Sequence, residues 1–453
     1  MGFDGNTITF EKNISLILLY NIFLHIYAAA LHLAASWNPK AKQWVRGRRG
    51  WKLDLQTKIN LWQAEAGGSH KKDTSGMQGA SAKIVWMHCA SLGEFEQGRP
   101  LLEALRISHP EYKILLTFFS PSGYEIRKNH KAADHIMYLP MDGAENAQDF
   151  VAMVKPSLVL WVKYEYWHYY LAALKKSAIP VLLVSGIFRP SQPFFKWYGK
   201  FWQTMLDCFK QLFVQNNGSR QLLETIERSN LCTVTGDTRF DRVIDVAANY
   251  TPLAPQLEAF CRGHQVLVAG STWEEDEEEL IHYTRVYPQI KFVIAPHEVS
   301  EERIKDLLEE FPQAVLYSSL IAEPSVGNHH SNVLIIDNIG SLSKLYKYAT
   351  ITYVGGGFNQ SGIHNILEAA VYGKAVVFGP VYEKFAEARD LVDAGGAFSI
   401  ENALELEDLL NKLLNDQQKL DRAGEIARNY VFEHHGATEK IMEYIYTKRL
   451  LTN

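Results

Sequence analysis

Beyond residue 82, short apolar runs alternate with longer segments in which apolar residues recur at helical spacing. In the first half of the chain these runs lie at residues 83–90, 113–120, 135–140, 158–162, 181–186, 212–215 and 232–236. Almost continuously apolar runs, separated by segments long enough for helices, are typical of parallel strands that are buried on both faces. The pattern therefore predicts a doubly wound α/β domain.

The same pattern starts again after residues 251–256, which contain two prolines and predict a linker between domains. Further strands are expected at residues 266–271, 291–296, 314–318, 333–337, 351–356 and 375–379. A helix is predicted over residues 365–372 with Gly373 as its C-cap, and more helices over residues 403–450. Two doubly wound domains in tandem predict a cleft at the carboxyl ends of their strands, where such sheets bind ligands.

Residues 14–35 form an apolar stretch without Asp, Glu, Lys or Arg, and about 20 such residues can span a bilayer. Asn21, His25 and His32 interrupt it. A signal peptide would carry its charges first and a small-residue cleavage site afterwards, so that class is excluded. Basic residues and tryptophans follow at once, as on the cytoplasmic side of membrane segments: Lys40, Lys42, Arg46, Arg48, Arg49 and Lys52, with Trp37, Trp44 and Trp51.

This stretch predicts a membrane anchor, with the remaining chain in the cytoplasm. A helix that spans the bilayer and a helix that lies in the membrane interface both fit the pattern. A buried or amphipathic helix that packs on the protein is the alternative.

The expected domain organisation has five parts. Residues 1–52 form the anchor and its basic flank, and residues 53–82 form a linker that ends in a small, polar, flexible stretch. Residues 83–250 form the first Rossmann-like domain and residues 251–425 the second. Residues 426–453 form C-terminal helices that could pack back on the first domain.

Composition excludes several classes of protein. The chain has 46 basic and 51 acidic residues, whereas a dedicated nucleic-acid binder would show a strongly basic domain, so no nucleic-acid partner is expected. A hydrophobic content of 47% excludes global disorder. The four cysteines lie far apart without a C-x-x-C motif, which predicts neither a disulfide framework nor a zinc site and indicates a reducing compartment. The histidines and acidic residues form no H-E-x-x-H motif, so no metal is expected.

Two acidic residues follow predicted strands of the first domain. Glu94 comes after the run at 83–90, and Glu165 comes after the run at 158–162. A carboxylate at the carboxyl end of a strand can accept a proton from a hydroxyl nucleophile. A carboxylate also caps a helix N-terminus favourably, and position alone favours that structural role for Glu94. Two acids at corresponding edges of one sheet indicate a site more strongly than one.

The second domain contains a glycine-rich loop, Gly355–Gly357, which leads to His364, Asn365 and Glu368. Such a loop lets a phosphate approach backbone N–H groups, and Glu368 could bind ribose hydroxyls. A tight turn without a ligand explains the loop equally well. Ser271 and Thr272, at another strand end, could hydrogen-bond a phosphate. His297, at the end of the next strand, fits a surface loop residue as well as it fits a ligand.

Taken in order, these segments resemble the 3-deoxy-D-manno-octulosonic acid (Kdo) transferases, from about Ile84 to the C-terminus. Val234–Asp241 is similar to the family's stretch that closes the first domain. The most specific pieces are His88-x-x-Ser91-x-Gly93-Glu94, Gly355-Gly356, Gly362-x-His364-Asn365-x-Leu367-Glu368, Tyr372-Gly373-Lys374-Ala375-Val376 and Phe378-Gly379-Pro380. The resemblance implies the GT-B fold, with two doubly wound Rossmann-like domains facing a cleft. It also implies an enzyme of lipopolysaccharide synthesis on the cytoplasmic face of the inner membrane, which the N-terminal anchor fits.

The resemblance further implies an inverting transfer of Kdo from CMP-Kdo to a hydroxyl of a lipid A precursor, lipid IVA. Glu94 matches the family's general base, and Glu165 matches the second acid of its E-x-E-x-W motif, which helps shape the site. No metal or other cofactor is implied. The residues that would bind CMP, with its phosphate against backbone N–H groups, are Ser271, Thr272, Pro296, His297, Asp337, Gly340, Ser341, Gly362, His364, Asn365 and Glu368.

The chain departs from the family's pattern mainly on the acceptor side. The first acid of E-x-E-x-W is Lys163, and the usual Pro-Asn after the Trp is His168-Tyr169. The arginine of the family's N-x-R-x-S stretch is displaced to Arg189, and the arginine that usually precedes His297 is replaced by Pro296. Candidates for binding the Kdo carboxylate or the acceptor's phosphates are Lys163, Arg189 and Lys384.

Three other functions are compatible with the residues. They are a GT-B transferase that uses a UDP-sugar, a nucleotide-sugar epimerase of the same fold, and a membrane-tethered binding protein without activity. The epimerase would not need the anchor, and the identity of the bound nucleotide separates both UDP enzymes from a Kdo transferase. The presence of Glu94, Glu165 and Glu368 together favours an enzyme over the binding protein.

Overall fold

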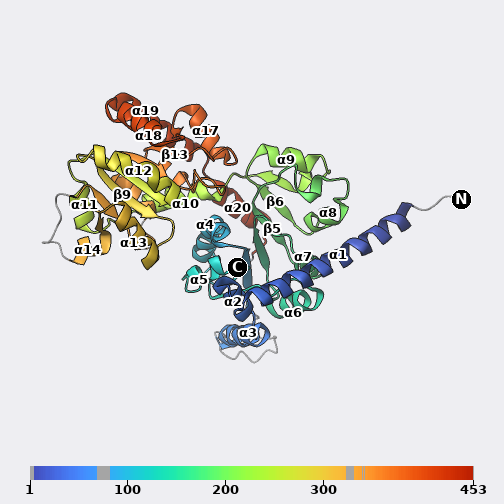
Figure 1. Ribbon diagram of the computed structural model, residues 1–453. Coiled ribbons are helices and arrows are strands. Elements are labelled where there is room, and N and C mark those ends of the chain that lie inside the picture. Colours follow the sequence, from blue (N-terminus) through green and yellow to red (C-terminus); the bar gives the residue numbers. More distant parts are fainter. Residues whose placement is uncertain (1–4, 69–81, 323–330, 339, 341, 452–453) are drawn as a thin grey trace. The chain divides into compact units, whose positions relative to one another are not determined.

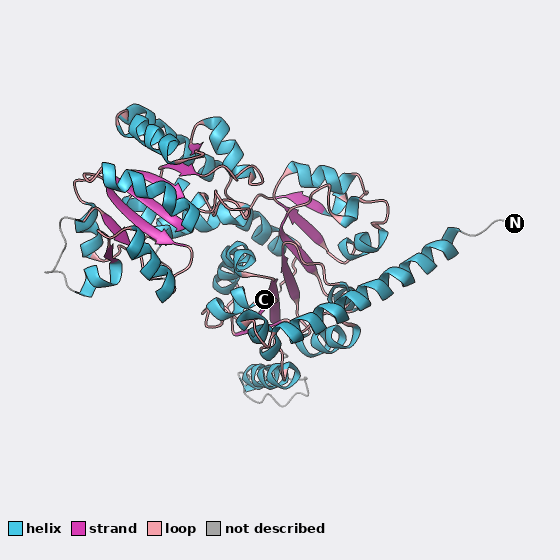
Figure 2. Cartoon of the chain, in the orientation of Figure 1, coloured by secondary structure: helices cyan, strands magenta, loops and turns pink. Residues whose placement is uncertain are grey.

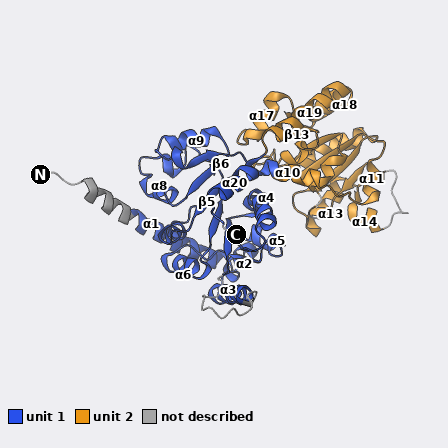
Figure 3. Cartoon of the chain, turned by 180° about the vertical axis from the view of Figure 1, so that it is seen from behind, with its two compact units in different colours: residues 1–241, 436–453 blue, residues 242–435 orange. Residues whose placement is uncertain are grey.

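The computed structural model describes residues 5–68, 82–322, 331–338, 340 and 342–451, without the side chains of residues 5–15 and 68 (Figure 1). The chain forms two compact units. Unit 1 comprises residues 1–241 and 436–453, and unit 2 comprises residues 242–435 (Figure 3).

Unit 1 is built on a seven-stranded parallel sheet covered by helices (Figure 2). In spatial order its strands are β3 (His135–Tyr138), β2 (Lys113–Phe118), β1 (Ile84–Cys89), β4 (Leu158–Val162), β5 (Val181–Gly186), β6 (Gln211–Val214) and β7 (Cys232–Val234). The chain moves outward in one direction from β1 to β3 and in the other from β4 to β7, so the strand order reverses between β1 and β4. Ligands of doubly wound sheets bind at such a switch point.

Alternate residues of these strands enter two hydrophobic cores. On β1, Trp86 packs on one face of the sheet and Met87 on the other. The helices that follow the strands are α4 (Leu92–Ser108), α5 (Pro121–Arg127), α6 (Ala144–Val154), α7 (His168–Lys176), α8 (Lys200–Leu206) and α9 (Asn217–Glu224), with short turns η1 (Pro193–Phe195) and η2 (Ser229–Leu231). Helix α10 (Thr238–Ala248) begins in unit 1 and continues into unit 2. The C-terminal helix α20 (Ala437–Thr447) belongs to unit 1, where Ile441 and Ile445 are buried in the second core.

Helix α3 (Trp51–Gly68) occupies most of the stretch that was predicted as a linker over residues 53–82, so that prediction is wrong for residues 53–68. Leu55, Ile59 and Trp62 recur at helical spacing and are buried in the core of unit 1. Their periodicity was hidden by the polar residues between them and by the adjoining glycine-rich stretch. The remainder of the predicted linker, residues 69–81, lies outside the described residues.

Unit 2 has a second seven-stranded parallel sheet, with the order β10 (Val315–Leu316), β11 (Val333–Ile335), β9 (Lys291–Pro296), β8 (Val266–Thr272), β12 (Ile351–Val354), β13 (Ala375–Phe378) and β14 (Ala397–Ser399). Its switch point lies between β8 and β12. The helices are α11 (Pro255–Cys261), α12 (Glu274–Val286), α13 (Glu301–Glu310), α14 (Tyr317–Ala322), α15 (Leu342–Leu345) with η4 (Tyr346–Tyr348), α16 (Leu367–Ala370), α17 (Ala386–Ala394), α18 (Ala403–Leu414) and α19 (Gln417–Glu433). The two parallel sheets confirm the predicted α/β class.

Two details of unit 2 differ from the prediction. The helix expected over residues 365–372 is the shorter α16, Leu367–Ala370, and the Asn365 side chain accepts a hydrogen bond from the Leu367 N–H at its start. Gly373 does adopt the left-handed conformation expected of a C-cap, with φ of +69°. The edge strand β14 was not predicted, because three residues are too few to show a periodicity.

Helix α1 spans Gly5–Ala34, and between residues 16 and 34 it is apolar on two opposite faces. Leu16–Ala34 has a mean hydropathy of 1.8 and is long and apolar enough to cross a membrane, a test that signal sequences and some core helices also pass. One face packs on unit 1 through Leu16, Ile17, Tyr20, Leu24, Tyr27 and Leu31. The opposite face is exposed and carries Leu18, Leu19, Ile22, Phe23, Ile26 and Leu33.

Hydrogen bonds join α1 to the start of α7. The Tyr20 hydroxyl donates to Asp142 Oδ2 over 2.6 Å, and the Tyr169 hydroxyl donates to Asn21 Oδ1 over 2.7 Å. Asp142 is buried and also accepts from the backbone N–H groups of Tyr169 and Tyr170. We call this set of groups the α1 clamp. It contains Asn21, a residue that interrupts the apolar stretch, and gives it a partner on unit 1.

Candidate active site

The two acids predicted in unit 1 lie on either side of its switch point. Glu94 is in the first turn of α4, directly after β1, and Glu165 follows β4, the neighbouring strand. Their carboxylates are close enough for the charge of Glu165 to affect the protonation of Glu94. The sheet topology therefore brings together two residues that are 71 positions apart (165 − 94).

Glu94 is a capping residue and a perturbed acid at once. Its Oε2 accepts a hydrogen bond of 2.8 Å from the Ser91 N–H, within a capping box, and the side chain is buried. Burial, and next the negative charge of Glu165, raise the pKa of Glu94 to about 7, although backbone N–H groups and Lys163 act in the opposite direction. The helix N-terminus alone would keep this carboxylate ionised at neutral pH. Burial outweighs that effect and gives Glu94 the pKa of a base that works near neutrality.

Glu165 is held by two tryptophans. The Trp167 indole N–H donates to Glu165 Oε2 over 3.0 Å, and the Trp161 indole N–H donates to the Glu165 carbonyl oxygen. Trp167 packs against Phe119, which itself contacts Tyr27 of α1. The aromatic residues Trp161 and Trp167 thus hold Glu165 in place, and Trp167 connects it through Phe119 to the N-terminal helix.

Lys163 and Arg189, two basic residues at positions where the chain departs from the family's pattern, both lie beside the ring of Tyr164. Lys163, which stands where the family has an acid, has a φ of +57° and places its ammonium 5.0 Å from the centre of the Tyr164 ring. The Arg189 guanidinium lies 5.9 Å from the same ring. The structure thus brings together two of the three predicted anion-binding candidates on unit 1. The third, Lys384, is in unit 2 and donates to the Gln360 carbonyl.

Asp237 is a charged residue of this region that the sequence did not single out. It accepts hydrogen bonds of 2.9 and 3.0 Å from Gln97, one turn after Glu94, and one of 2.8 Å from Arg239. Burial alone would raise the pKa of Asp237, but the charges of Arg239 and Lys163 hold it below its usual value. Its position at the end of β7, in the quoted family stretch, was the signal available in the sequence.

In unit 2, the glycines around the switch point are required by packing between strand-end loops. A Cβ on Gly355 would lie 2.3 Å from the Ser271 carbonyl oxygen, and a Cβ on Gly357 would lie 2.5 Å from the Gly379 nitrogen. Gly362, predicted to contact CMP, has a φ of +73°, which favours glycine by itself. These contacts account for the glycine-rich loop through chain packing, whether or not a phosphate also binds there.

Three rings stack beside this loop. The His297 ring lies 4.6 Å from Trp273 and 4.4 Å from His364, and the three planes are within 24° of parallel in each neighbouring pair. The Trp273 indole N–H donates to His364 Nε2 over 3.0 Å. Burial, and next the proximity of His297, lower the pKa of His364 to about 4, so His364 is neutral at pH 7. The sequence predicted both histidines but missed Trp273, which directly follows the predicted pair Ser271 and Thr272.

Asp276 ties the glycine-rich loop to the start of α12. It is buried and accepts hydrogen bonds from the Gly356 N–H, the Trp273 N–H and the Tyr353 hydroxyl. Thr272, predicted as a phosphate contact, is also buried, and its hydroxyl donates inward to Glu277 over 2.6 Å. The Thr272 hydroxyl is therefore engaged within unit 2 in the described structure.

The other predicted nucleotide contacts are distributed along the same sheet. The Asn365 amide donates to Glu368 Oε1 over 3.2 Å, so these two residues form a pair. Asp337, two residues after β11, accepts a hydrogen bond from the Ser318 N–H and another from the Ser318 hydroxyl. Pro296 ends β9, Gly340 has a φ of +99°, and Ser341 lies outside the described residues.

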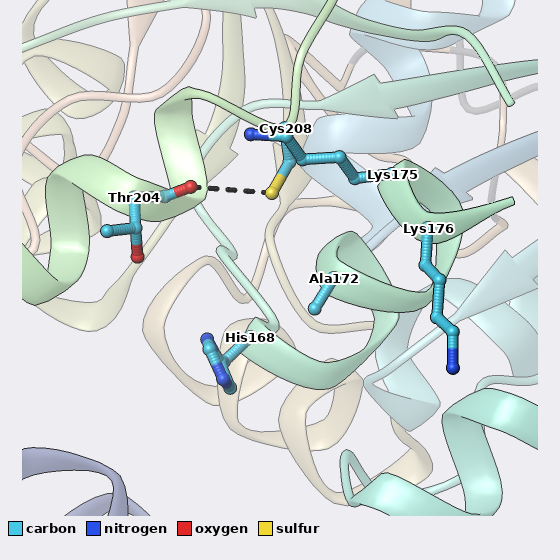
Figure 4. A pocket seen from close by; sticks show the side chains of 6 residues that line it. All are labelled: His168, Ala172, Lys175, Lys176, Thr204 and Cys208. Carbon is cyan, nitrogen blue, oxygen red and sulfur yellow. Dashed lines mark hydrogen bonds between the residues drawn. The ribbon is translucent and has the colours of Figure 1, made fainter. Parts of the chain in front are cut away.

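The structure also contains a pocket between α7 and α8, lined by His168, Ala172, Lys175, Lys176, Thr204 and Cys208 (Figure 4). It contains none of the predicted site residues. Among the described residues, no group of three or more His, Cys, Asp or Glu side chains is placed to hold a metal ion.

Comparison with known proteins supports the family predicted from the motifs. Residues 61–242 match the family model described as 3-deoxy-D-manno-octulosonic-acid transferase. The chain is 26% identical over 392 residues to a Kdo transferase of Rickettsia typhi, covering 81% of this chain and 83% of that protein. It is 25% identical to a Kdo transferase of Haemophilus influenzae, covering 80% and 86%.

Among solved structures, a UDP-GlcNAc 2-epimerase of Neisseria meningitidis, bound to UDP-GlcNAc, matches with a TM-score of 0.57 at 17% identity. The match covers 81% of this chain and 100% of that one. At this identity the likeness concerns the fold alone, and it confirms the predicted GT-B class. The sequence matches confirm the predicted family resemblance.

Proposed function

From the premise that this chain is a glycosyltransferase of the Kdo transferase family, we propose that it transfers Kdo from CMP-Kdo to a hydroxyl of a lipid A precursor, lipid IVA. Glu94 is the general base. The observation that carries the proposal is the pair of acids at the switch point of unit 1, in which burial and Glu165 bring the pKa of Glu94 to about 7.

The proposed reaction is a single displacement. The Glu94 carboxylate takes the proton of the acceptor hydroxyl as that oxygen forms a bond to the anomeric carbon of Kdo. The bond between this carbon and the CMP phosphate oxygen breaks on the opposite side, and CMP leaves with the electron pair, which inverts the configuration. A base with a pKa of about 7 is about half ionised at neutral pH and is strong enough to accept this proton.

Charge on the acceptor side is provided by Lys163 and Arg189. Kdo carries a carboxylate and a lipid A precursor carries phosphates, and both are anions that cations near the site stabilise. Lys163 already lowers the pKa of Glu94 and so acts on the same carboxylate. In this proposal the replacement of the family's first acid by Lys163 strengthens binding of the anionic substrates at the cost of basicity at Glu94.

CMP binds to unit 2. The ring stack of Trp273, His297 and His364 offers flat apolar faces, and the switch point offers backbone N–H groups for a phosphate. The pair of Asn365 and Glu368 provides the amide and carboxylate groups that ribose hydroxyls can bind. We expect no metal to take part, so the backbone N–H dipoles at the switch point stabilise the departing CMP.

The protein works at the cytoplasmic face of the inner membrane, and α1 lies in the membrane interface. Its exposed apolar face enters the headgroup and acyl boundary, and the exposed basic residues that follow it, Lys40, Lys42, Arg46 and Arg49, face anionic lipids. The α1 clamp supports this arrangement over a spanning helix. A spanning α1 would have to withdraw Tyr20 and Asn21 from their partners on unit 1 and leave Asp142 with fewer hydrogen bonds.

The test is CMP release from freshly generated CMP-Kdo, with and without a tetraacylated lipid A precursor, in detergent. We expect acceptor-dependent release of CMP and a lipid product heavier by one or more Kdo residues, read by mass spectrometry. Release of no CMP by folded protein would contradict the proposal. Turnover of a UDP-sugar under the same conditions would instead support a UDP-dependent transferase.

A further inference from the structure

His88 opens the most specific sequence motif of the first domain, but the proposed reaction gives it no role. It lies on β1, and its side chain is fully buried. In the sheet register its neighbours are Thr117 on β2 and Trp161 on β4. A fully buried imidazole needs partners for both ring nitrogens, because an unpaired polar atom in the interior is costly.

Thr117 sets the tautomer of His88. The Trp86 indole N–H, which can only donate, gives its hydrogen to Thr117 Oγ1 over 2.8 Å. His88 Nδ1 lies 2.9 Å from the same oxygen, while the other acceptor within reach of the Thr117 hydroxyl, the Met87 carbonyl, is 3.5 Å away. The Thr117 hydroxyl therefore donates to His88 Nδ1, and the imidazole hydrogen is on Nε2.

His88 Nε2 points at Glu165. The distance from Nε2 to Glu165 Oε2 is 3.6 Å, and Nε2 has no hydrogen-bond partner within the part of the chain that the structure describes. The same oxygen accepts the Trp167 indole N–H. The Trp161 ring contacts His88 at 4.6 Å and donates to the Glu165 carbonyl, so one residue fixes the positions of both partners.

We propose that His88 is a positioning residue that directs its Nε2–H at the Glu165 carboxylate and, together with Trp167, holds that carboxylate beside Glu94. A movement of a few tenths of an ångström closes the gap between Nε2 and Oε2 to a hydrogen bond. The proposal rests on the proposed function in so far as Glu94 is the base.

Other charged or titratable groups also face this pair. Lys163, on the same loop as Glu165, faces Glu94. The Tyr27 hydroxyl of α1 faces Glu165, and so does Arg48, which lies after helix α2 (Pro39–Arg46). None of the three donates a hydrogen bond to Glu165 in the described structure, so the indole of Trp167 and the imidazole of His88 are the two donors aimed at its carboxylate.

Loss of the His88 donor is expected to lower the pKa of Glu94. Without the Nε2–H, the Glu165 carboxylate is held by one donor only and can rotate away from Glu94 toward solvent. Weaker repulsion then lowers the pKa of Glu94, because the charge of Glu165 is one of the causes that raise it. The acidic limb of the pH profile of kcat moves to lower pH, and the plateau falls because a weaker base transfers the proton less readily.

The experiment compares His88→Phe, which keeps the ring shape without the donor, with His88→Gln, which keeps an N–H near Nε2. In the full chain in detergent, we expect His88→Phe to move the acidic limb down by about 0.5 pH unit or more and to lower the plateau several-fold. His88→Gln is expected to restore much of both. His135→Phe, a replacement of a partly buried strand histidine on β3, is the matched control and is expected to leave the limb in place.

A double-mutant cycle connects the effect to Glu165. Glu165→Gln alone also moves the limb to lower pH, and His88→Phe added to it is expected to cause no further shift. An unchanged limb in His88→Phe, or a shift of equal size in the presence and absence of Glu165, would overturn the proposal.

A second readout does not depend on activity. The pKa of Glu94 in the folded protein is raised above its usual 4.5, so the native state binds this proton more tightly than the unfolded state does. The free energy of unfolding that Glu94 contributes is therefore present below about pH 4.5 and is lost as the pH rises through about 7. The difference in thermal midpoint between wild type and Glu94→Gln, followed from pH 5 to 8, isolates this loss.

The same difference, measured in the His88→Phe background, is expected to be smaller. An equal difference in both backgrounds would overturn the role of His88 even if no transfer activity were found. Wild-type protein that shows this difference but releases no CMP would contradict the proposed function and leave the positioning role supported.

Discussion

The two units have the same kind of seven-stranded parallel sheet, yet the loops at their switch points differ in chemistry. In unit 1 the strands on either side of the switch point lead to carboxylates, Glu94 and Glu165, which are buried or half-buried and interact. In unit 2 they lead to glycines and to the ring stack of Trp273, His297 and His364. A carboxylate whose pKa is about 7 can exchange a proton near neutral pH, whereas His364, with a pKa of about 4, cannot.

The difference accounts for the separate roles that the proposed reaction gives the two units. The sheet determines where a site forms, because both sites lie where the strand order reverses. The side chains in the loops determine which half can carry a charge change. In the proposed reaction unit 1 contains the group that changes its protonation, Glu94, and the proposed donor site of unit 2 contains His364, which stays neutral near pH 7.

The largest effect is expected for Glu94→Gln. Removing the base should lower kcat by roughly 100-fold to 10,000-fold, since that is the usual contribution of general base catalysis. CMP binding, measured by calorimetry, should stay close to wild type, because its proposed groups are in unit 2. Turnover within tenfold of wild type would contradict the role of Glu94 as the base and, with it, the assignment of the proton transfer to unit 1.

Deleting residues 1–36 is expected to reduce flotation with anionic lipid vesicles by on the order of tenfold, because the exposed apolar face of α1 is lost. CMP binding should not change. If the truncated protein still floats completely with the vesicles, other basic and aromatic residues of unit 1 carry the association.

Trp273→Ala is expected to weaken CMP binding by about tenfold. An aromatic side chain stacked on a base contributes about 1–3 kcal/mol of binding free energy, which is lost when the ring is removed. The substitution breaks the ring stack and removes the hydrogen bond to His364. Trp273→Phe is the matched control, since it keeps a ring and loses the N–H. A shift in the acidic limb of kcat in either variant would show that unit 2 takes part in the proton transfer after all.

The smallest effect is expected for Glu165→Gln on the pH profile. In wild type, kcat should rise with pH through about 7, as Glu94 loses its proton. Glu165→Gln removes a negative charge next to Glu94, so the limb should move to lower pH by a fraction of a unit to about one unit. If the limb moved to higher pH, the negative charge of Glu165 would not be its main effect on the pKa of Glu94.

The sequence predicts the sheets well because each strand is an apolar run bounded by polar residues. It also predicts the edge at which Glu94 and Glu165 lie, because parallel strands end on one side. It does not predict the partners across the sheet. Nothing in the motif around His88 indicates that Thr117 fixes its tautomer, and nothing around Thr272 indicates that its hydroxyl turns inward to Glu277.

The errors have physical causes too. Leu55, Ile59 and Trp62 of α3 were included in a linker because a glycine-rich stretch adjoins them, although tertiary packing makes this segment helical. Trp273 was missed because an aromatic after a strand is more often a packing residue than a site residue. Only the positions of His297 and His364 show that its ring belongs to their stack.

The α1 clamp also sets an order of events during synthesis. Asp142 lies 122 residues after Tyr20, and Tyr169 lies 148 residues after Asn21. At about 5–20 residues per second, the ribosome needs on the order of ten seconds to make the partners of a helix that is already complete. Throughout that interval both apolar faces of α1 lack the protein surface that later covers one of them. We therefore expect the nascent helix to bind the membrane first, and the rest of unit 1 to fold against a helix that is already bound to lipid.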